Sequence, residues 1–222
     1  MSEQQYKRYI VSTFLTDTTC DMYYTHSLCE SAKALIVNQV ALIPMLTQIV
    51  DGRVMAFNQT VTLAWNEKVD GIIFINPNAI WEPQALFDLI SSDKDCLALP
   101  ITSPVGFNIQ IGEIPRLQRD DQTGEIKVPY ASMDFMYLSS YTINELCTTH
   151  QSIDYNGQDV KMVLQTGDIF TGYYNESQIL KSRLSDLNIE TWVNPNHTIA
   201  TTQRQPIQGD FASLLVDLEK KG

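Results

Sequence analysis

The sequence predicts an α/β protein with a mostly parallel central sheet flanked by helices and with a small antiparallel part. The clearest observation is Gly71–Ile75, a continuous apolar run of the kind found in strands buried on both faces. A second is that strand-like and helix-like patterns alternate along the first half of the chain. Composition agrees, because 44% of the 222 residues are hydrophobic and 18% are charged. We expect one domain over residues 1–222.

The first elements are a strand, a helix and a second strand. Tyr9–Leu15 is rich in β-forming residues and ends at polar residues that would cap a helix from about Asp21. Val40–Leu46 is apolar enough for a strand, and Pro44 places it at a sheet edge or a strand end. Gly52–Asn66 lacks strand alternation and is predicted to be a helix.

The central strand is followed by another helix and strand. Trp81-Glu82-Pro83 opens a helix over Gln84–Ser91, with proline in the first turn where its missing N–H is tolerated. Asp95–Pro100 is a short strand. Parallel sheets bind ligands at the carboxyl ends of their strands, and Asn76 and Asn78 follow such an end.

The later part of the chain alternates less regularly. In order, we expect a long loop or irregular hairpin over residues 101–127, a strand over Val128–Leu138, helices over Thr142–His150 and Glu176–Leu187, a strand over Thr191–Val193 and a terminal helix over Gly209–Lys220. Asp120 and Asp121 precede a Thr-Gly turn, where adjacent carboxylates are more often a solvated tip than metal ligands.

Composition and missing motifs disfavour several classes of function. The net charge is -11, which disfavours extensive nucleic-acid binding because such binding needs phosphate neutralisation. The apolar runs are too short for a membrane span, and the N-terminus lacks a signal-peptide pattern, so we expect a soluble cytoplasmic protein. The four cysteines have the irregular spacing of reduced thiols. The motifs of dinucleotide oxidoreductases, P-loop enzymes, serine hydrolases and zincins are absent.

Several short motifs follow one another along the chain, within a likeness to a known family that extends from Tyr9 to about Leu215. They are Ala56-Phe57-Asn58, Phe74-Ile75-Asn76-Pro77-Asn78, Trp81-Glu82-Pro83, Glu176-Ser177 with Arg183, Trp192-Val193-Asn194-Pro195, Thr201 and Gly209-Asp210-Phe211. In this order and spacing the chain resembles the GT-A fold glycosyltransferases, especially family-two-like proteins common in bacterial and viral genomes. The resemblance implies a GT-A (Rossmann-like) fold and a nucleotide sugar as the ligand.

The chain departs from that family at its metal site. In the family two aspartates of an Asp-x-Asp motif and a histidine hold Mg²⁺ or Mn²⁺ against the donor diphosphate, because hard cations favour anionic oxygen ligands. The matching residues here are Asn76, Asn78 and Thr201, which carry no negative charge. We therefore expect no metal cofactor, a divalent metal being disfavoured.

The resemblance also gives candidate site residues. The aspartate that resembles the family's catalytic base or its supporting group is Ser177, which cannot accept a proton without an activating partner. Candidate bases are Glu176, Asp134 and Asp168. Helix N-termini and arginines would stabilise a diphosphate in place of a metal. The candidate nucleotide-sugar-binding residues are Arg53, Asn58, Asn76, Asn78, Trp81, Arg183 and Thr201, with Arg204 as a further cation.

Three functions remain open at this point. The first is a metal-independent glycosyltransferase that moves a sugar from a nucleotide donor to an acceptor. The second is a catalytically inactive GT-A protein that serves as a sugar-binding, partner-binding or structural module. The third is an unrelated α/β nucleotide-binding protein. The acceptor, whether a glycan, a protein or a modified nucleobase, is left open.

Overall fold

A seven-stranded sheet forms the centre of the computed structural model, which describes residues 6–16, 20–49, 52–103, 106–110, 117–165, 175–202, 206–207 and 210–220. The strand order is β2-β1-β3-β11-β5-β14-β9. The strands are β1 (Lys7–Leu15), β2 (Val40–Gln48), β3 (Gly71–Ile75), β5 (Cys96–Ala98), β9 (Ile126–Lys127), β11 (Phe135–Ser139) and β14 (Trp192–Val193). β1, β2, β3, β5 and β14 share one direction, whereas β11 and β9 run the opposite way. The predicted, mostly parallel sheet is confirmed.

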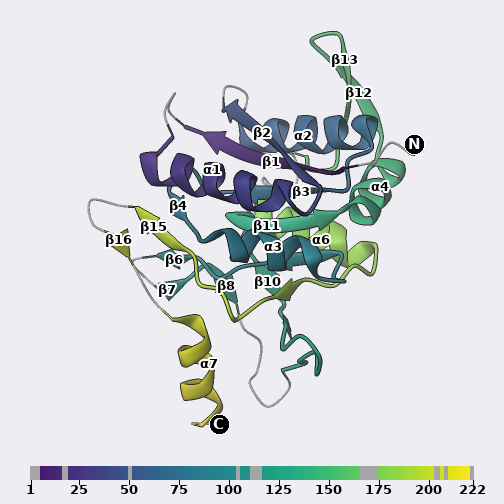
Figure 1. The fold of residues 1–222 in the computed structure, drawn as a ribbon. Helices are drawn as coiled ribbons and strands as arrows, with labels where there is room; N and C mark the ends of the chain where they lie inside the picture. Colours follow the sequence, from purple (N-terminus) through teal and green to yellow (C-terminus); the bar gives the residue numbers. More distant parts are fainter. Residues whose placement is uncertain are drawn as a thin grey trace, which may run out of the picture.

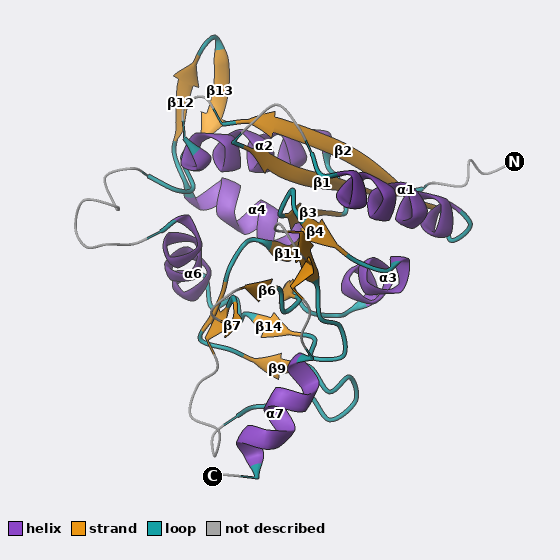
Figure 2. Cartoon of the chain, turned by 90° about the vertical axis from the view of Figure 1, so that its left-hand side faces the viewer, coloured by secondary structure: helices purple, strands orange, loops and turns teal. Residues whose placement is uncertain are grey.

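Helices cover both faces of this sheet (Figures 1 and 2). α1 (Met22–Ile36) and α3 (Pro83–Ser91) pack on one face. α2 (Arg53–Glu67), α4 (Ser140–Thr149) and α6 (Glu176–Asp186) pack on the other, and α7 (Phe211–Glu219) ends the described chain.

The strand β3 contributes to both hydrophobic cores. Ile72 and Phe74 point to the core beneath α2, where Phe74 stacks on Phe57 with ring centroids 5.1 Å apart. Ile73 and Ile75 point to the core beneath α1 and α3. Because successive side chains of a strand face opposite ways, a strand covered on both sides needs an unbroken apolar run. This explains the pattern by which β3 is recognised in the sequence.

Small antiparallel sheets surround the central one. They pair β16 (Pro206–Ile207) with β15 (Ala200–Thr202) and β15 with β4 (Ala79–Ile80), β6 (Thr102–Ser103) with β7 (Gly106–Phe107), β8 (Ile109–Gln110) with β10 (Tyr130–Ala131), and β12 (Ser152–Tyr155) with β13 (Gln158–Lys161). The pairing of β4 with β15 brings Thr201 opposite Ala79, directly after Asn78. The predicted small antiparallel part is therefore present.

Most predicted elements are confirmed, and several regions differ. Residues 101–127, expected to form a long loop or irregular hairpin, contain the short strands β6, β7, β8 and β9, and β9 belongs to the central sheet. The predicted strand Val128–Leu138 is wrong, because a turn at residues 132–134 divides it into β10 and β11. The hairpin β12–β13 was not predicted, although Asn156 and Gly157 have the positive φ angles, 52° and 78°, of a tight hairpin turn. Pro44 does lie in an edge strand, β2, as expected.

The remaining composition-based expectations concern thiols, charge and membranes. The cysteines are free, and burial raises the pKa of the Cys96 and Cys147 thiols to about 12, which keeps them protonated and unreactive.

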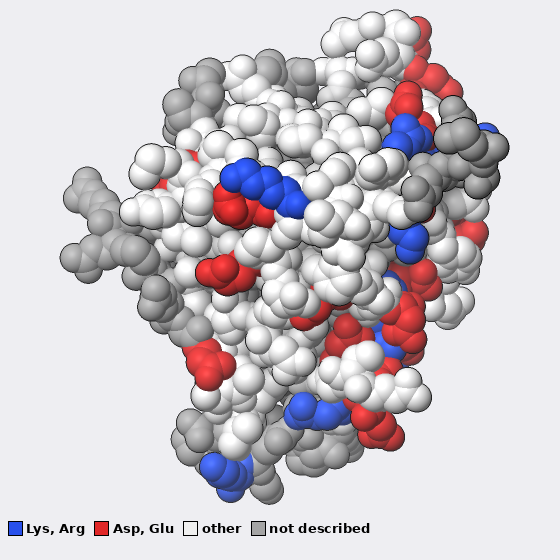
Figure 3. All heavy atoms as spheres, in the orientation of Figure 1, with Lys and Arg blue, Asp and Glu red and all other residues white. Residues whose placement is uncertain are grey.

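On the described part of the face in Figure 3, Lys and Arg side chains lie scattered among Asp and Glu and form no continuous basic patch. Every helix in the described ranges is too short or too polar to cross a membrane.

Candidate functional site

A cleft of about 190 Å³ lies at the carboxyl ends of β1 and β3. Its polar lining comes from Ser12, Thr16, Arg53, Asn76, Asn78 and Asp134, and its apolar lining includes Phe14, Ile49, Phe74 and Met133. These residues belong to the end of β1, the residue after β2, the first turn of α2, the end of β3 with the turn that follows it, and the turn before β11. The cleft therefore lies where a parallel sheet is expected to bind a ligand.

The Asn76-Pro77-Asn78 segment forms a tight turn in this cleft. The Asn76 Oδ1 atom accepts a hydrogen bond of 2.9 Å from the backbone N–H of Asn78. The carbonyl of Asn78 accepts hydrogen bonds from the N–H and the hydroxyl of Thr202, at 2.8 and 3.3 Å. The side chain of Asn76 thus shapes the turn, whereas that of Asn78 is exposed.

The turn before β11 is joined to this segment. The Asn76 N–H donates to the Asp134 carbonyl at 2.7 Å, and the Asn76 Nδ2 donates to the Asp134 Oδ1 at 3.3 Å. The carboxylate of Asp134 is therefore fixed at the cleft wall beside the end of β3.

Arg53 is the cation of the cleft lining. It is the first residue of α2, and its Nη2 lies 3.8 Å from Asp134 Oδ1, beyond hydrogen-bond distance. Its Nε is shielded from solvent and has no hydrogen-bond partner among the described residues, while the side chain as a whole is 41% exposed. A guanidinium whose donors are incompletely used is suited to a further anionic partner.

Among the described residues in and beside the cleft, the donor groups differ from those of a typical divalent-metal site. Asp134 is the carboxylate among the lining residues, and Arg53 lies beside it. The Asn76 Oδ1 is occupied by the Asn78 N–H, and the Thr201 hydroxyl donates to the carbonyl of Thr102 at 3.1 Å. Mg²⁺ and Mn²⁺ need several oxygen ligands with negative charge and are repelled by a guanidinium.

The residues of the Glu-Ser motif lie next to the cleft wall. Ser177 is buried in the first turn of α6, and its hydroxyl accepts a hydrogen bond of 3.1 Å from the N–H of Met133. Glu176 is half-buried and does not line the cleft. Ser177 thus supports the turn that carries Asp134.

Thr201 and three further predicted binding residues lie outside the cleft lining. Both polar atoms of the fully buried Asn58 side chain bind the backbone of Leu164, at 2.8 and 2.9 Å. The Trp81 indole N–H donates to Ser31 at 2.9 Å. The Nε of Arg183 donates to the Val163 carbonyl at 3.2 Å. Their contacts with a nucleotide sugar stay predictions, as do those of Asp168 and Arg204, which lie outside the described residues.

Sequence reasoning missed several polar residues near the cleft. Ser12 and Thr16 follow from the topology, since β1 is parallel to β3 and ends at the same sheet edge. Ser132 and Asn108, which contact Asp134 directly and indirectly, belong to no motif. Nothing in the local sequence around them marks a site.

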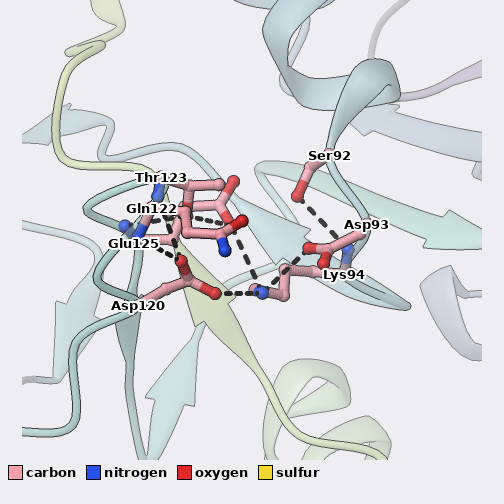
Figure 4. Close-up of polar contacts among 7 residues, drawn as sticks. All are labelled: Ser92, Asp93, Lys94, Asp120, Gln122, Thr123 and Glu125. Atoms are coloured by element: carbon pink, nitrogen blue, oxygen red, sulfur yellow. Dashed lines mark hydrogen bonds and ion pairs between the residues drawn. The ribbon is translucent and has the colours of Figure 1, made fainter.

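Asp120, which the sequence analysis considered as a possible metal ligand, pairs with a lysine side chain. Figure 4 shows the Lys94 ammonium between Asp93 and Asp120, at 2.8 and 2.6 Å, with the buried Glu125 4.0 Å away. The same ammonium lies 4.8 Å from the ring centroid of Trp192. The Lys94 cation therefore already occupies the position that a metal ion would take at Asp120.

Replacing Lys94 by methionine should lower the free energy of unfolding by about 2 kcal/mol near neutral pH. The substitution leaves the buried Glu125 without its nearby cation. The expected loss in the free energy of unfolding lies between the losses typical of exposed and of fully buried ion pairs. Urea unfolding measures the change. The matched substitution Lys33→Met, at an exposed pair with Glu30, should leave the stability close to that of the wild type. Equal losses in the two variants would contradict the assignment.

The same cluster gives the protein a pH dependence. The hydrogen bond from Lys94, followed by those from the N–H groups of Thr123 and Gln122, holds the pKa of Asp120 below its ordinary value of 3.8. A lowered folded-state pKa stabilises the fold above the unfolded-state value, and that stability is lost as the pH falls below about 4. Wild-type stability should therefore fall more steeply than that of Lys94→Met between pH 5 and pH 2.

Comparisons with known proteins concern the fold. No protein-family model and no curated protein matches this sequence. Among solved structures, A197 from STIV is 7% identical, covers 88% of this chain and 86% of its own, and has a TM-score of 0.52. GalNAc-T7 with UDP, GalNAc and Mn²⁺ is 11% identical and has a TM-score of 0.54. The match covers 92% of this chain but 45% of that one, so this chain spans less than half of its length. Such low identities show the fold alone, and the fold of this chain is GT-A-like.

Proposed function

We propose that this protein binds a nucleotide sugar in the cleft at the ends of β1 and β3, and transfers its sugar to an acceptor without a standard metal bound by an Asp-x-Asp motif. The observation that carries the proposal is the position of Arg53, which lines the same cleft as the Asn76-Pro77-Asn78 turn and lies 3.8 Å from Asp134. GalNAc-T7, whose fold is similar, was solved with UDP. Together these support a diphosphate as the group that Arg53 binds.

The charges in the cleft support a metal-free arrangement. A diphosphate needs positive charge both when it binds and when it leaves as the sugar is transferred. Arg53 supplies a fixed cation with several donors, and the first N–H groups of α2 lie beside it. Gly52 precedes α2 and gives it no side-chain cap. In the glycosyltransferases that this chain resembles, a metal neutralises the diphosphate. Here Arg53 and the N-terminus of α2 would do so instead.

The size of the cleft favours recognition of part of the ligand. Small-molecule sites usually begin at about 300 Å³, whereas the described cleft measures about 190 Å³. That space suits a diphosphate and its immediate substituents. The candidate bases Asp134, Glu176 and Asp168 and the motif residue Ser177 remain part of the proposal, and among them Asp134 lines the cleft.

Thermal shift with nucleotide sugars tests the proposal. At a ligand concentration of about 100 times Kd, linkage should raise the Tm by about 5 to 10 °C for a protein of this size. The increase should be the same in EDTA as in Mn²⁺, and Arg53→Gln should abolish it. The control Lys33→Gln removes an exposed charge on α1 and should leave the increase unchanged.

The possible outcomes separate the parts of the proposal. Absence of any increase with UDP-, GDP- and CMP-sugars would exclude nucleotide-sugar binding. An increase that requires Mn²⁺ would exclude metal independence. Binding without release of UDP, GDP or CMP in the presence of glycan and protein acceptors would instead identify a sugar-nucleotide-binding module without transferase activity.

A further inference from the structure

A chain of hydrogen bonds leads from the backbone of Ile101, which directly precedes β6, to the carboxylate of Asp134. The N–H of Ile101 donates to Asn108 Oδ1 at 2.8 Å, and the Asn108 Nδ2 contacts the Ser132 hydroxyl at 2.6 Å. The Ser132 hydroxyl contacts the Asp134 Oδ2 at 2.6 Å and the Asp134 N–H at 3.2 Å.

The direction of every bond in this chain is fixed. A backbone N–H can only donate, so the Asn108 atom facing Ile101 is its oxygen and the atom facing Ser132 is its NH₂ group. The Ser132 oxygen thus accepts from two N–H donors, which fills its two lone pairs. Its single proton must therefore point to the carboxylate of Asp134.

Asp134 consequently acts as an acceptor with capacity to spare. A carboxylate offers about four lone-pair sites, and the described residues fill one on Oδ2, from Ser132, and one on Oδ1, from Asn76. The Asp134 side chain is 26% exposed and lines the cleft. A ligand group that donates a hydrogen bond can therefore reach it.

We propose that Asp134 accepts a hydrogen bond from a hydroxyl group of the bound nucleotide sugar, and that Ser132 and Asn108 are positioning residues that hold its carboxylate for this contact. The proposal rests on the function proposed above and divides the ligand between two groups. Arg53 binds the phosphates, and Asp134 binds a hydroxyl of the ribose or of the sugar. A carboxylate would repel the phosphates, which is why the two neighbouring side chains take different parts of the ligand.

The substitution Asp134→Asn tests this division with two kinds of probe. Calorimetric titrations in EDTA would use UDP-glucose, UDP-N-acetylglucosamine and GDP-mannose, which carry hydroxyls, and pyrophosphate, which carries none. The variant should bind each nucleotide sugar recognised by the wild type about 10- to 100-fold more weakly, because a charge-assisted hydrogen bond is lost. It should bind pyrophosphate as well as the wild type or more tightly, because a negative charge beside Arg53 is removed.

The positioning residues are tested with the same probes. Ser132→Ala should weaken nucleotide-sugar binding several-fold, and Ser132→Thr, which keeps the hydroxyl, should restore it. Asn108→Asp keeps the acceptor for Ile101 but removes the NH₂ donor, so it should also weaken nucleotide-sugar binding. Pyrophosphate binding should stay unchanged in Ser132→Ala, whereas a merely structural defect would affect both probes.

Asp159→Asn is the matched control, because it removes an exposed carboxylate from the hairpin β12–β13. It should leave all affinities within about twofold of the wild type. If Asp134→Asn also leaves nucleotide-sugar affinity within twofold, or weakens both probes equally, the role of Asp134 is refuted while the proposed function stands. If the wild type binds neither probe, the proposed function itself fails, and the inference fails with it.

Discussion

Replacing Asn58 by alanine should lower the free energy of unfolding by about 3 to 4 kcal/mol. The Asn58 side chain is fully buried in α2, and its amide pairs with both the N–H and the carbonyl of Leu164. Alanine would leave these two backbone groups buried without a partner, at about 1 to 3 kcal/mol each. For a chain of this length the Tm should fall by roughly 10 °C. Urea and thermal unfolding measure the change.

The same variant separates two roles for Asn58. The resemblance to glycosyltransferases places this residue among those that bind the nucleotide sugar, whereas its contacts hold the chain at Leu164 against α2. At a temperature where Asn58→Ala is folded, we expect its affinity for nucleotide sugars to stay within about threefold of the wild type. Thr62→Val is a suitable comparison on the same helix, because it removes the hydroxyl that accepts from the Lys161 N–H and donates to the Asn58 carbonyl but leaves the Asn58 side chain intact. A large loss of affinity with little loss of stability would favour the binding role.

Local sequence patterns predicted the helices and strands in which burial follows a regular pattern from residue to residue. β3 could be recognised because both of its faces are buried, and α2 because its apolar residues lack strand alternation. The strand ends that line the cleft followed from this topology, and so did the position of Asn76. The sequence therefore sufficed for most strands of the central sheet and for the location of the cleft, whereas β9 and the turn before β11 were not predicted.

Contacts between distant residues decided what the sequence did not predict. The turn that separates β10 from β11 contains the buried Met133 and is held by Ser177, 44 residues later, so it looked like part of a strand. The partner of Asn58 lies 106 residues away, which no local pattern could indicate. The hairpin at Asn156 is different, because its Asn-Gly signal is present in the sequence and was overlooked.

Introducing carboxylates at the turn after β3 should make the stability of the protein depend on a divalent metal. In Asn76→Asp with Asn78→Asp, the hydrogen bond from the Asn76 Nδ2 to Asp134 Oδ1 is replaced by two carboxylates facing each other over about the same distance of 3.3 Å. In EDTA the double variant should therefore be about 1 to 3 kcal/mol less stable than the wild type.

Addition of Mn²⁺ should reverse this loss in the double variant. Together with Asp134, in the neighbouring turn before β11, the two substitutions bring three carboxylates to one cleft, a ligand set with the charge and oxygen donors that hard cations favour. The Tm of the variant should rise by several degrees in millimolar Mn²⁺, while that of the wild type should change by less than about 1 °C, following the linkage between binding and stability. Asn66→Asp with Asn144→Asp adds the same charge near the far end of α2 and should show no such response.

The change in the wild-type Tm on addition of Mn²⁺ also tests the proposed metal independence. A wild-type Tm that rises as much as that of the double variant would show that Asn76 and Asn78 hold the metal through their amide oxygens, and the metal-independent mechanism would be wrong. A rise confined to the double variant would instead mean that the two amides at this turn prevent metal binding. Arg53 would then remain as the cation for the diphosphate, since a guanidinium 3.8 Å from Asp134 is the positive group that this cleft provides among its described residues.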